Sequence, residues 1–213
     1  MDRFSNRQKI ALAIMPMPTG LLSALASGSV IYSILRSRVR LKVPYRRLVF
    51  GISLFDFLSS ISYAMSTIPV PKEKSLVPSL SFGNEVSCSF QAFFFITGYM
   101  GGVLFSCSLC LYYYYSIKKQ ISFRVFAKKI EPYLHGIAIG WAFLISIVCL
   151  SDRAFDATPT HCSIASDPPD CIQYDDVECI KGERAYIYQW AFLGVPCWIV
   201  FFTIIFIMLS IGK

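Results

Sequence analysis

The chain has 213 residues, of which 55% are hydrophobic and only 15% are charged, and its mean hydropathy is +0.55. Soluble domains carry charge on nearer a quarter of their residues, so this composition excludes an ordinary soluble protein and indicates one that resides in lipid. The net charge of +7 does not require a nucleic-acid partner, because the basic residues gather in loops that can lie against anionic lipid.

Five apolar stretches follow one another along the chain. They cover residues 10–35, 48–70, 90–115, 133–150 and 185–211. About 20 helical residues are needed to cross a hydrocarbon core of about 30 Å, so each stretch is long enough to span a membrane. We therefore predict an all-α, polytopic membrane helix bundle with five transmembrane helices, organised as a single domain over residues 1–213. The first stretch is too long for a signal peptide and is expected to be its own insertion signal.

The loops between these stretches alternate in charge, which predicts the orientation of the protein. The loops after the first and third stretches contain eleven basic residues and one acid, Glu131, whereas the loop 152–184 contains eight acids and three bases. Lysine and arginine concentrate on the cytosolic side. We expect a multi-pass protein of the plasma membrane with its N-terminus outside and Lys213 in the cytosol. The basic residues that precede the first stretch oppose this orientation but are fewer.

The second stretch contains a carboxylate, Asp56, near its middle. A charge there costs about 2.5–3.5 kcal/mol on insertion scales, so it must face a polar partner or a function. Polar residues recur at helical spacing around it and predict one polar face directed into the bundle. They are Ser53, Asp56, Ser60, Tyr63 and Thr67. This face could be a network that changes between two conformations or a hydrogen-bonded contact that only orients helices.

The third and fifth stretches carry packing features. Gly98 and Gly102 form a small-x-x-x-small pair that allows close helix contact. The tyrosines 112–115 fit an interfacial aromatic belt or a signalling surface. Pro196 removes a backbone hydrogen bond from the last stretch and is expected to bend it.

Four cysteines lie at or beyond the predicted outer edge, where disulfides persist. They are Cys88, Cys162, Cys171 and Cys179. Three pairings are open. We favour Cys88 with Cys162, which would fasten the long loop to the third stretch, and Cys171 with Cys179, which would close a small loop containing Asp175, Asp176 and Glu178. Zinc or calcium could compete for these side chains, but the spacing fits neither metal, so we expect no metal site and no cofactor.

Together these features resemble the first five spans of a seven-helix G-protein-coupled receptor, of the rhodopsin-like or the slime-mould cyclic-AMP-receptor-like kind. Five features carry the resemblance, in the correct order. They are Gly28-Ser29-Val30-Ile31-Tyr32, Ser53-Leu54-Phe55-Asp56, Cys88, Trp141 and Pro196.

The resemblance implies a cell-surface receptor that transmits the binding of an extracellular ligand to a heterotrimeric G protein, and that could associate with other receptors. In that family the span-three cysteine bonds to the second outer loop, which supports Cys88 with Cys162. The span-two aspartate lies in a polar core that rearranges on activation, here Asp56 with Ser29, Ser53, Ser60 and Tyr63. Family geometry suggests ligand-lining residues, namely Gln91, Phe94, Thr97, Tyr186 and Gln189. The inner loops suggest transducer-facing residues, namely Arg36, Arg46, Arg47, Tyr113, Lys118 and Lys119. The acidic outer loop would favour a cationic ligand.

The sequence also departs from the family. The acid-arginine-tyrosine triplet expected near the inner end of span three is replaced by Tyr112, Tyr113 and Tyr114, and Ser29 stands where an asparagine is usual in rhodopsin-like members. Spans six and seven are missing, so the receptor is expected to be incomplete in this chain.

Three other classes of protein remain open. A small transporter or channel would also place an acid at mid-membrane. A truncated, non-signalling protein could act by associating with other receptors. An enzyme is not expected, because the only two histidines, His135 and His161, fall on opposite sides of the predicted membrane.

Overall fold

A computed structural model describes residues 5–168, 171 and 178–212. Asp175, Asp176 and Lys213, which entered the sequence analysis, lie outside the described residues. Five helices in the structure are long and apolar enough to span a membrane. They are Asn6–Arg36, Pro44–Ala64, Glu85–Lys118, Glu131–Ser151 and Ala185–Ile211. The predicted all-α, polytopic membrane helix bundle is confirmed.

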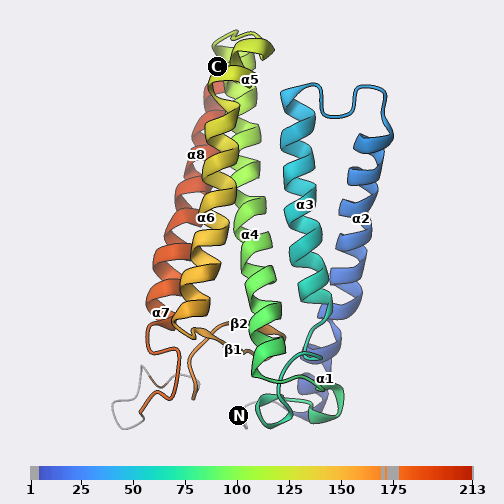
Figure 1. The fold of residues 1–213 in the computed structure, drawn as a ribbon, viewed down its shortest axis with the longest axis vertical. Coiled ribbons are helices and arrows are strands. Elements are labelled where there is room, and N and C mark those ends of the chain that lie inside the picture. The colour runs from blue at the N-terminus through green and yellow to red at the C-terminus, as the bar shows by residue number, and fades with distance from the viewer. Residues whose placement is uncertain (1–4, 169–170, 172–177, 213) are drawn as a thin grey trace.

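Proline divides the first span into two helices. α1 (Asn6–Ile14) is capped by Ser5, whose hydroxyl accepts a hydrogen bond from the Gln8 backbone N–H. α2 (Pro16–Arg36) then begins at a residue without a backbone N–H, which is well tolerated in a first helical turn. Figure 1 shows α1 at one end of the bundle and α2 running along its side.

The second span is shorter than predicted. α3 (Pro44–Ala64) ends six residues before the expected boundary at residue 70. Ser66 takes a left-handed backbone conformation with φ of 47°, and Pro69 and Pro71 follow. Residues before proline avoid the helical region, so the chain cannot continue as a helix although it stays apolar. Val70, at the end of this segment, is fully buried in the loop.

α4 (Glu85–Tyr113) is the central helix. It contacts α3, α6 (Glu131–Ser151) and α8 (Val195–Ile211), and α2 packs on the far side of α3 (Figure 1). The contact with α3 is close at Gly98, where an added Cβ would lie 2.5 Å from the Ser59 backbone nitrogen. At Gly102 an added Cβ would lie 2.7 Å from the Asp56 carboxylate. The close helix packing predicted from this glycine pair is therefore present.

The two ends of the bundle differ in structure. One end, here called the hairpin end, carries α1 and an antiparallel pair of short strands, β1 (Phe155–Ala157) and β2 (Cys162–Ile164), in which Phe155 pairs with Ile164 (Figure 1). The opposite end, here called the α5 end, carries the short helix α5 (Phe123–Lys129) (Figure 1). The sequence analysis predicted neither the strands nor α5.

The last span is irregular in front of its proline. α7 (Ala185–Tyr188) is followed by a π-helical turn, Gln189–Gly194, and α8 starts at Val195. Pro196 has no N–H to donate to the turn before it, and its ring crowds that turn, so the hydrogen-bond pattern changes there. The disruption of regular helix that Pro196 predicts is therefore a π-helical turn directly in front of it.

Candidate functional site

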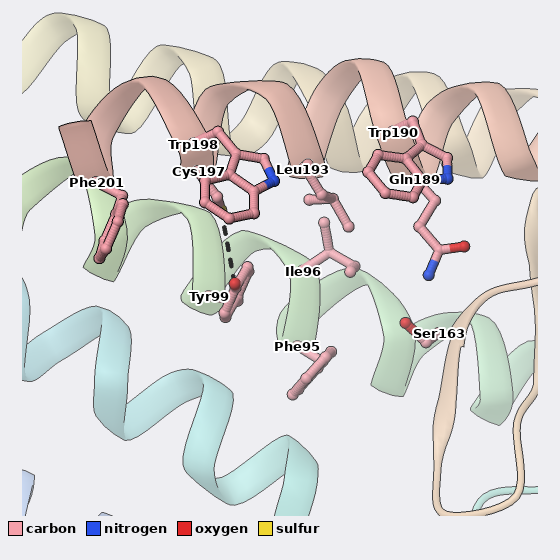
Figure 2. A pocket seen from close by; sticks show the side chains of 11 residues that line it. Phe95, Ile96, Tyr99, Ser163, Gln189, Trp190, Leu193, Cys197, Trp198 and Phe201 are labelled. Atoms are coloured by element: carbon pink, nitrogen blue, oxygen red, sulfur yellow. Dashed lines mark hydrogen bonds between the residues drawn. The ribbon is translucent and has the colours of Figure 1, made fainter. Parts of the chain in front are cut away.

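An open groove of about 770 Å³ runs between α4 and the last span, near the hairpin end. Figure 2 shows its side chains: Phe95, Ile96 and Tyr99 come from α4, and Ser163 comes from β2. The other wall is supplied by the π-helical turn and the first turns of α8. Its labelled residues are Gln189, Trp190, Leu193, Cys197, Trp198 and Phe201.

The groove is aromatic and uncharged. Among the described residues that line it there is no carboxylate, ammonium or guanidinium, and the polar groups are few. The Tyr99 hydroxyl lies 3.6 Å from the Cys197 sulfur, and the Gln189 amide extends into the groove (Figure 2). Such a surface suits a ligand with an aromatic or aliphatic body and a small number of hydrogen-bonding groups.

The β1–β2 hairpin is fastened to α4 beside this groove. A disulfide joins Cys88 to Cys162 with their Cα atoms 5.3 Å apart. Gln91 lies three residues further on and is therefore on the same face of α4. Its amide oxygen accepts a hydrogen bond from the Cys162 backbone N–H at 3.0 Å, and its amide nitrogen donates to the carbonyl oxygens of Ser62 and Ser66, both at 2.8 Å. α3, α4 and β2 thus meet at one buried side chain.

The second disulfide, Cys171–Cys179, is also present, so the favoured pairing of the four outer cysteines is the one found. Both bonds lie towards the hairpin end.

His161 lies directly behind the groove wall. Its ring makes an edge contact with Phe95, at 4.4 Å between centroids, and another with Tyr63, at 5.2 Å. Nδ1 lies 2.8 Å from the Thr160 hydroxyl, whereas Nε2 is buried without a hydrogen-bond partner among the described residues. Burial lowers the pKa of the His161 imidazole to about 4, so the ring is neutral at pH 7.

An ionic network holds the loops of the hairpin end together. The Lys74 ammonium lies 2.6 Å from Asp167, 3.0 Å from Asp156 and 3.2 Å from Glu85, and Lys181 binds Glu85 and Asp156. Burial alone would lower the pKa of Lys74, but hydrogen bonds to Asp167 and Asp156 more than offset this, so its pKa is raised. Each of the three acids of this network is therefore paired with at least one of the two lysines, which reduces the negative charge that the network presents to a ligand.

The predicted ligand-lining residues separate into different environments. Only Gln189 lines the groove. Gln91 is used in the hairpin contact, and Thr97 is buried where its hydroxyl donates to Ser146 of α6 at 2.7 Å. Phe94 packs between Phe90 and Phe93, and Tyr186 is exposed beside Trp190. The family geometry that suggested these residues did not account for the rotation of each helix of this chain about its axis.

The residues of the predicted polar face of α3 also contact different neighbours. The Ser60 hydroxyl donates to Ser23 of α2 at 2.8 Å, whereas Asp56 lies against Gly102 of α4 and Tyr63 stacks on Phe95. The helix turns about 100° per residue, so Asp56 points about 40° and Tyr63 about 60° away from Ser60. Ser53 is buried on the line of Ser60.

Two members of the predicted polar core, Asp56 and Ser29, form no side-chain hydrogen bond with the other members. The Asp56 carboxylate makes no hydrogen bond or ion pair with the described residues. Ser29 is exposed on α2, and its hydroxyl donates to the Leu25 carbonyl of its own helix. The expected continuous network is therefore two separate contacts plus an unpaired acid.

At the α5 end, the predicted transducer-facing residues also differ in their surroundings. Arg47 pairs through two hydrogen bonds with the buried Glu131 of α6, at 2.5 and 2.6 Å, so it joins two helices instead of facing solvent. Tyr113 packs against Tyr45 with ring centroids 6.2 Å apart. The remaining members are exposed or half-buried on the surface, namely Arg36, Arg46, Lys118 and Lys119.

Within the described part of the chain, no group of three or more His, Cys, Asp or Glu side chains is placed to hold a metal ion. Cys162, one of the cysteines considered for zinc, is not available to a metal, because its sulfur is bonded to Cys88.

The aromatic groove residues were missed by sequence analysis. Phe95, Tyr99, Trp190 and Trp198 occur in spans where nearly every residue is apolar, so no periodicity separates a groove face from a lipid face. Pro196 was the available signal in the sequence, because the turn in front of it is π-helical and such turns often occur at functional sites.

No family model matches the chain, and no curated protein matches it. Among solved structures, the crystal structure of squid rhodopsin is similar over 100% of this chain, with a TM-score of 0.64 and 16% sequence identity. The chain spans 58% of the length of that rhodopsin chain. The similarity shows that the five-helix bundle has a rhodopsin-like fold.

Proposed function

We propose that the protein is a cell-surface receptor of the G-protein-coupled type, which binds an extracellular ligand in the groove between α4 and α8. One observation carries this proposal: the groove lies directly beside a hairpin that a disulfide and Gln91 fasten to α4. A loop held in this way can cover a ligand without having to become ordered when the ligand binds.

The ligand we propose is neutral, with an aromatic or aliphatic body. Aromatic side chains form much of the groove wall, and none of the described residues that line it is charged. The cationic ligand expected from the net charge of the outer loop is less well supported, because Asp156, Asp167 and Glu85 already bind lysines.

We further propose that the hairpin end faces outside the cell and the α5 end faces the cytosol, in the plasma membrane. The disulfides at the hairpin end and the basic residues at the α5 end support this orientation. A heterotrimeric G protein would then meet the surface around Arg36, Arg46, Lys118 and Lys119, and the half-buried Asp56 would belong to the part that rearranges.

The detailed family relationship belongs to the same proposal. We propose that 1–213 is one domain whose helices correspond to the first five of seven, in a receptor of the rhodopsin-like or slime-mould cyclic-AMP-receptor-like kind that could associate with other receptors. The disulfide from the head of the third span to the loop after the fourth supports this correspondence. The transporter and the non-signalling alternatives gain no specific support from the groove.

The test is a signalling assay in cells that express the intact protein with an energy-transfer sensor of G-protein dissociation. The cells are exposed to a library of neutral aromatic and aliphatic compounds, and we expect at least one to produce a concentration-dependent signal. Leu193→Trp, which fills the groove, should abolish that signal, and Gln189→Ala should weaken it. Tyr186→Ala, which changes an exposed residue of the same span outside the groove, is the matched control.

Either of two results would contradict the proposal. A signal that persists unchanged in Leu193→Trp would place the ligand outside the groove. A library that produces no signal, while the surface amount of the protein is normal, would remove the support for a receptor of this ligand class.

A further inference from the structure

A second groove, of about 370 Å³, lies between α2 and α3 towards the α5 end. Its apolar wall includes Val30, Ile34 and Val49, and serine hydroxyls of α2 lie beside them. Arg46 and Ser37 form its edge where the two helices approach the loop 37–43. The groove therefore has an apolar part within the membrane spans and a basic part at their end.

Arg46 has unused hydrogen-bonding capacity. One of its terminal nitrogens donates to the uncharged Ser37 hydroxyl at 2.5 Å. The Arg46 side chain makes no other hydrogen bond to the described residues. A guanidinium has five N–H donors, so most remain free. The neighbouring Arg47 is different, because it points to the other side of α3 and pairs with Glu131.

The surrounding charge is entirely positive. Arg36, Arg38, Arg40 and Lys42 belong to the same helix end and loop, and none of them, nor Arg46, forms an ion pair with a carboxylate of the described residues. Five unpaired cations near the end of an apolar groove are complementary to an anionic headgroup that is attached to an apolar chain.

We infer that the groove between α2 and α3 binds an anionic phospholipid. The headgroup phosphate accepts hydrogen bonds from the Arg46 guanidinium and the Ser37 hydroxyl, and one acyl chain lies along Val30, Ile34 and Val49. The inference does not rest on the proposed receptor function: Arg46 also belongs to the surface proposed for a G protein, but the groove and its unpaired cations are present whether or not a G protein binds there. Free phosphate would satisfy Arg46 equally well but would leave the apolar part of the groove unfilled.

The test measures lipid binding by the purified protein in nonionic detergent, with native mass spectrometry. Phosphatidylserine and phosphatidylcholine with identical acyl chains are titrated separately, and we expect phosphatidylserine to bind at least about fivefold more tightly, the effect of about one favourable basic contact near a membrane surface. Arg46→Gln should weaken phosphatidylserine binding by about fivefold. Ser33→Phe, which fills the groove without a change of charge, should weaken the binding of the lipid by a similar factor.

Arg124→Gln is the matched control, because it removes the same charge from α5, where Arg124 is exposed and lies outside the groove. Its phosphatidylserine affinity should remain within about twofold of the unchanged protein, which is less than the effect of one surface contact. A thermal melt in the same detergent checks that all three variants are folded.

Any of four results would overturn the inference. Equal losses in Arg46→Gln and Arg124→Gln would show attraction by net charge alone. Unchanged binding in Ser33→Phe would show that no chain occupies the groove, and displacement of the lipid by millimolar inorganic phosphate would identify a site for the free ion. Equal affinity for the two phospholipids would remove the role of the basic residues.

Discussion

Individual side chains at the hairpin end connect segments that are far apart in the sequence. Gln91 joins the end of α3 to β2, and Lys74 joins the loop after α3 to β1 and to Asp167. His161 fills the space between Tyr63 and Phe95. These contacts hold the hairpin beside the aromatic groove, so their loss should affect the stability of that end and, through it, the shape of the groove.

Gln91→Ala should destabilise the protein. The substitution leaves the Cys162 N–H and the carbonyl oxygens of Ser62 and Ser66 without their side-chain partner, and a buried unsatisfied group costs about 1–3 kcal/mol. A thermal melt in detergent should show a lower midpoint than for the unchanged protein. Gln189→Ala is the control, since that amide makes no side-chain hydrogen bond to the described residues; equal losses in both variants would argue against the contact.

His161 should make stability sensitive to mild acid. Its pKa is about 4 in the folded protein and about 6.5 when unfolded, so the contribution of the neutral ring is complete above pH 6.5 and declines as the pH falls towards 4. Between pH 7 and pH 5 the free energy of unfolding should fall by about 2 kcal/mol.

Thermal melts at pH 7 and pH 5 measure this effect. His161→Phe should lose most of the difference between the two pH values, whereas His135→Phe, at the α5 end of α6, should retain it. A pH difference that is the same in His161→Phe and in the unchanged protein would assign the acid sensitivity to other groups.

At the scale of elements, the glycines of α4 decide how closely the central helix approaches α3. Gly98 contacts backbone atoms of Phe55 and Ser59, and Gly101 contacts the Phe55 ring. Gly136 of α6 has no atom within 4 Å of the position where a Cβ would be added, apart from its own helix and neighbours. The two kinds of glycine therefore have different tolerance of a side chain.

Gly98→Leu should cost about 3 kcal/mol or more, because the new side chain would overlap the α3 backbone, which cannot move aside as a flexible side chain could. Gly136→Leu, the same change on a face directed away from other helices, should be nearly neutral. The thermal midpoint and the fraction of monodisperse protein after detergent extraction measure both. Similar behaviour of the two variants would mean that α3 and α4 do not pack at Gly98.

At the scale of the whole molecule, the five helices form a bundle whose ends differ in charge and in chemistry. Both disulfides join segments of the hairpin end. The loops after the first and third spans, whose residues and helix ends include eleven basic side chains, lie at the α5 end (Figure 1). The aromatic groove and the basic groove are thereby separated along the bundle. This separation suits a protein that meets different partners on the two sides of a membrane.

The orientation can be tested with epitope tags in intact cells. We expect a tag before Ser5 to bind antibody without permeabilisation, whereas a tag inserted in the loop 37–43 should bind only after permeabilisation, because basic loops stay in the cytosol. A surface protein of known orientation is the control for membrane integrity. The opposite pattern would reverse the assignment of the two ends, and with it the outside location of the aromatic groove.

The sequence by itself determined that the chain crosses a membrane five times, because length and apolarity are additive properties of each segment. The order of the cysteines also allowed the correct pairing to be favoured. The boundary near residue 70 was wrong, because apolar composition does not register the left-handed turn at Ser66.

Only the tertiary structure decided which faces of the helices meet. Asp56 and Ser60 belong to one polar stripe in the sequence, yet they face different helices; Gln91 is a structural contact, and Gln189 lines the groove. In spans that are apolar all round, the rotation of each helix is set by packing against its neighbours, through glycine contacts and single buried hydrogen bonds. Hydropathy gives no information about that rotation, so the grooves could be located only after the helices had been placed together.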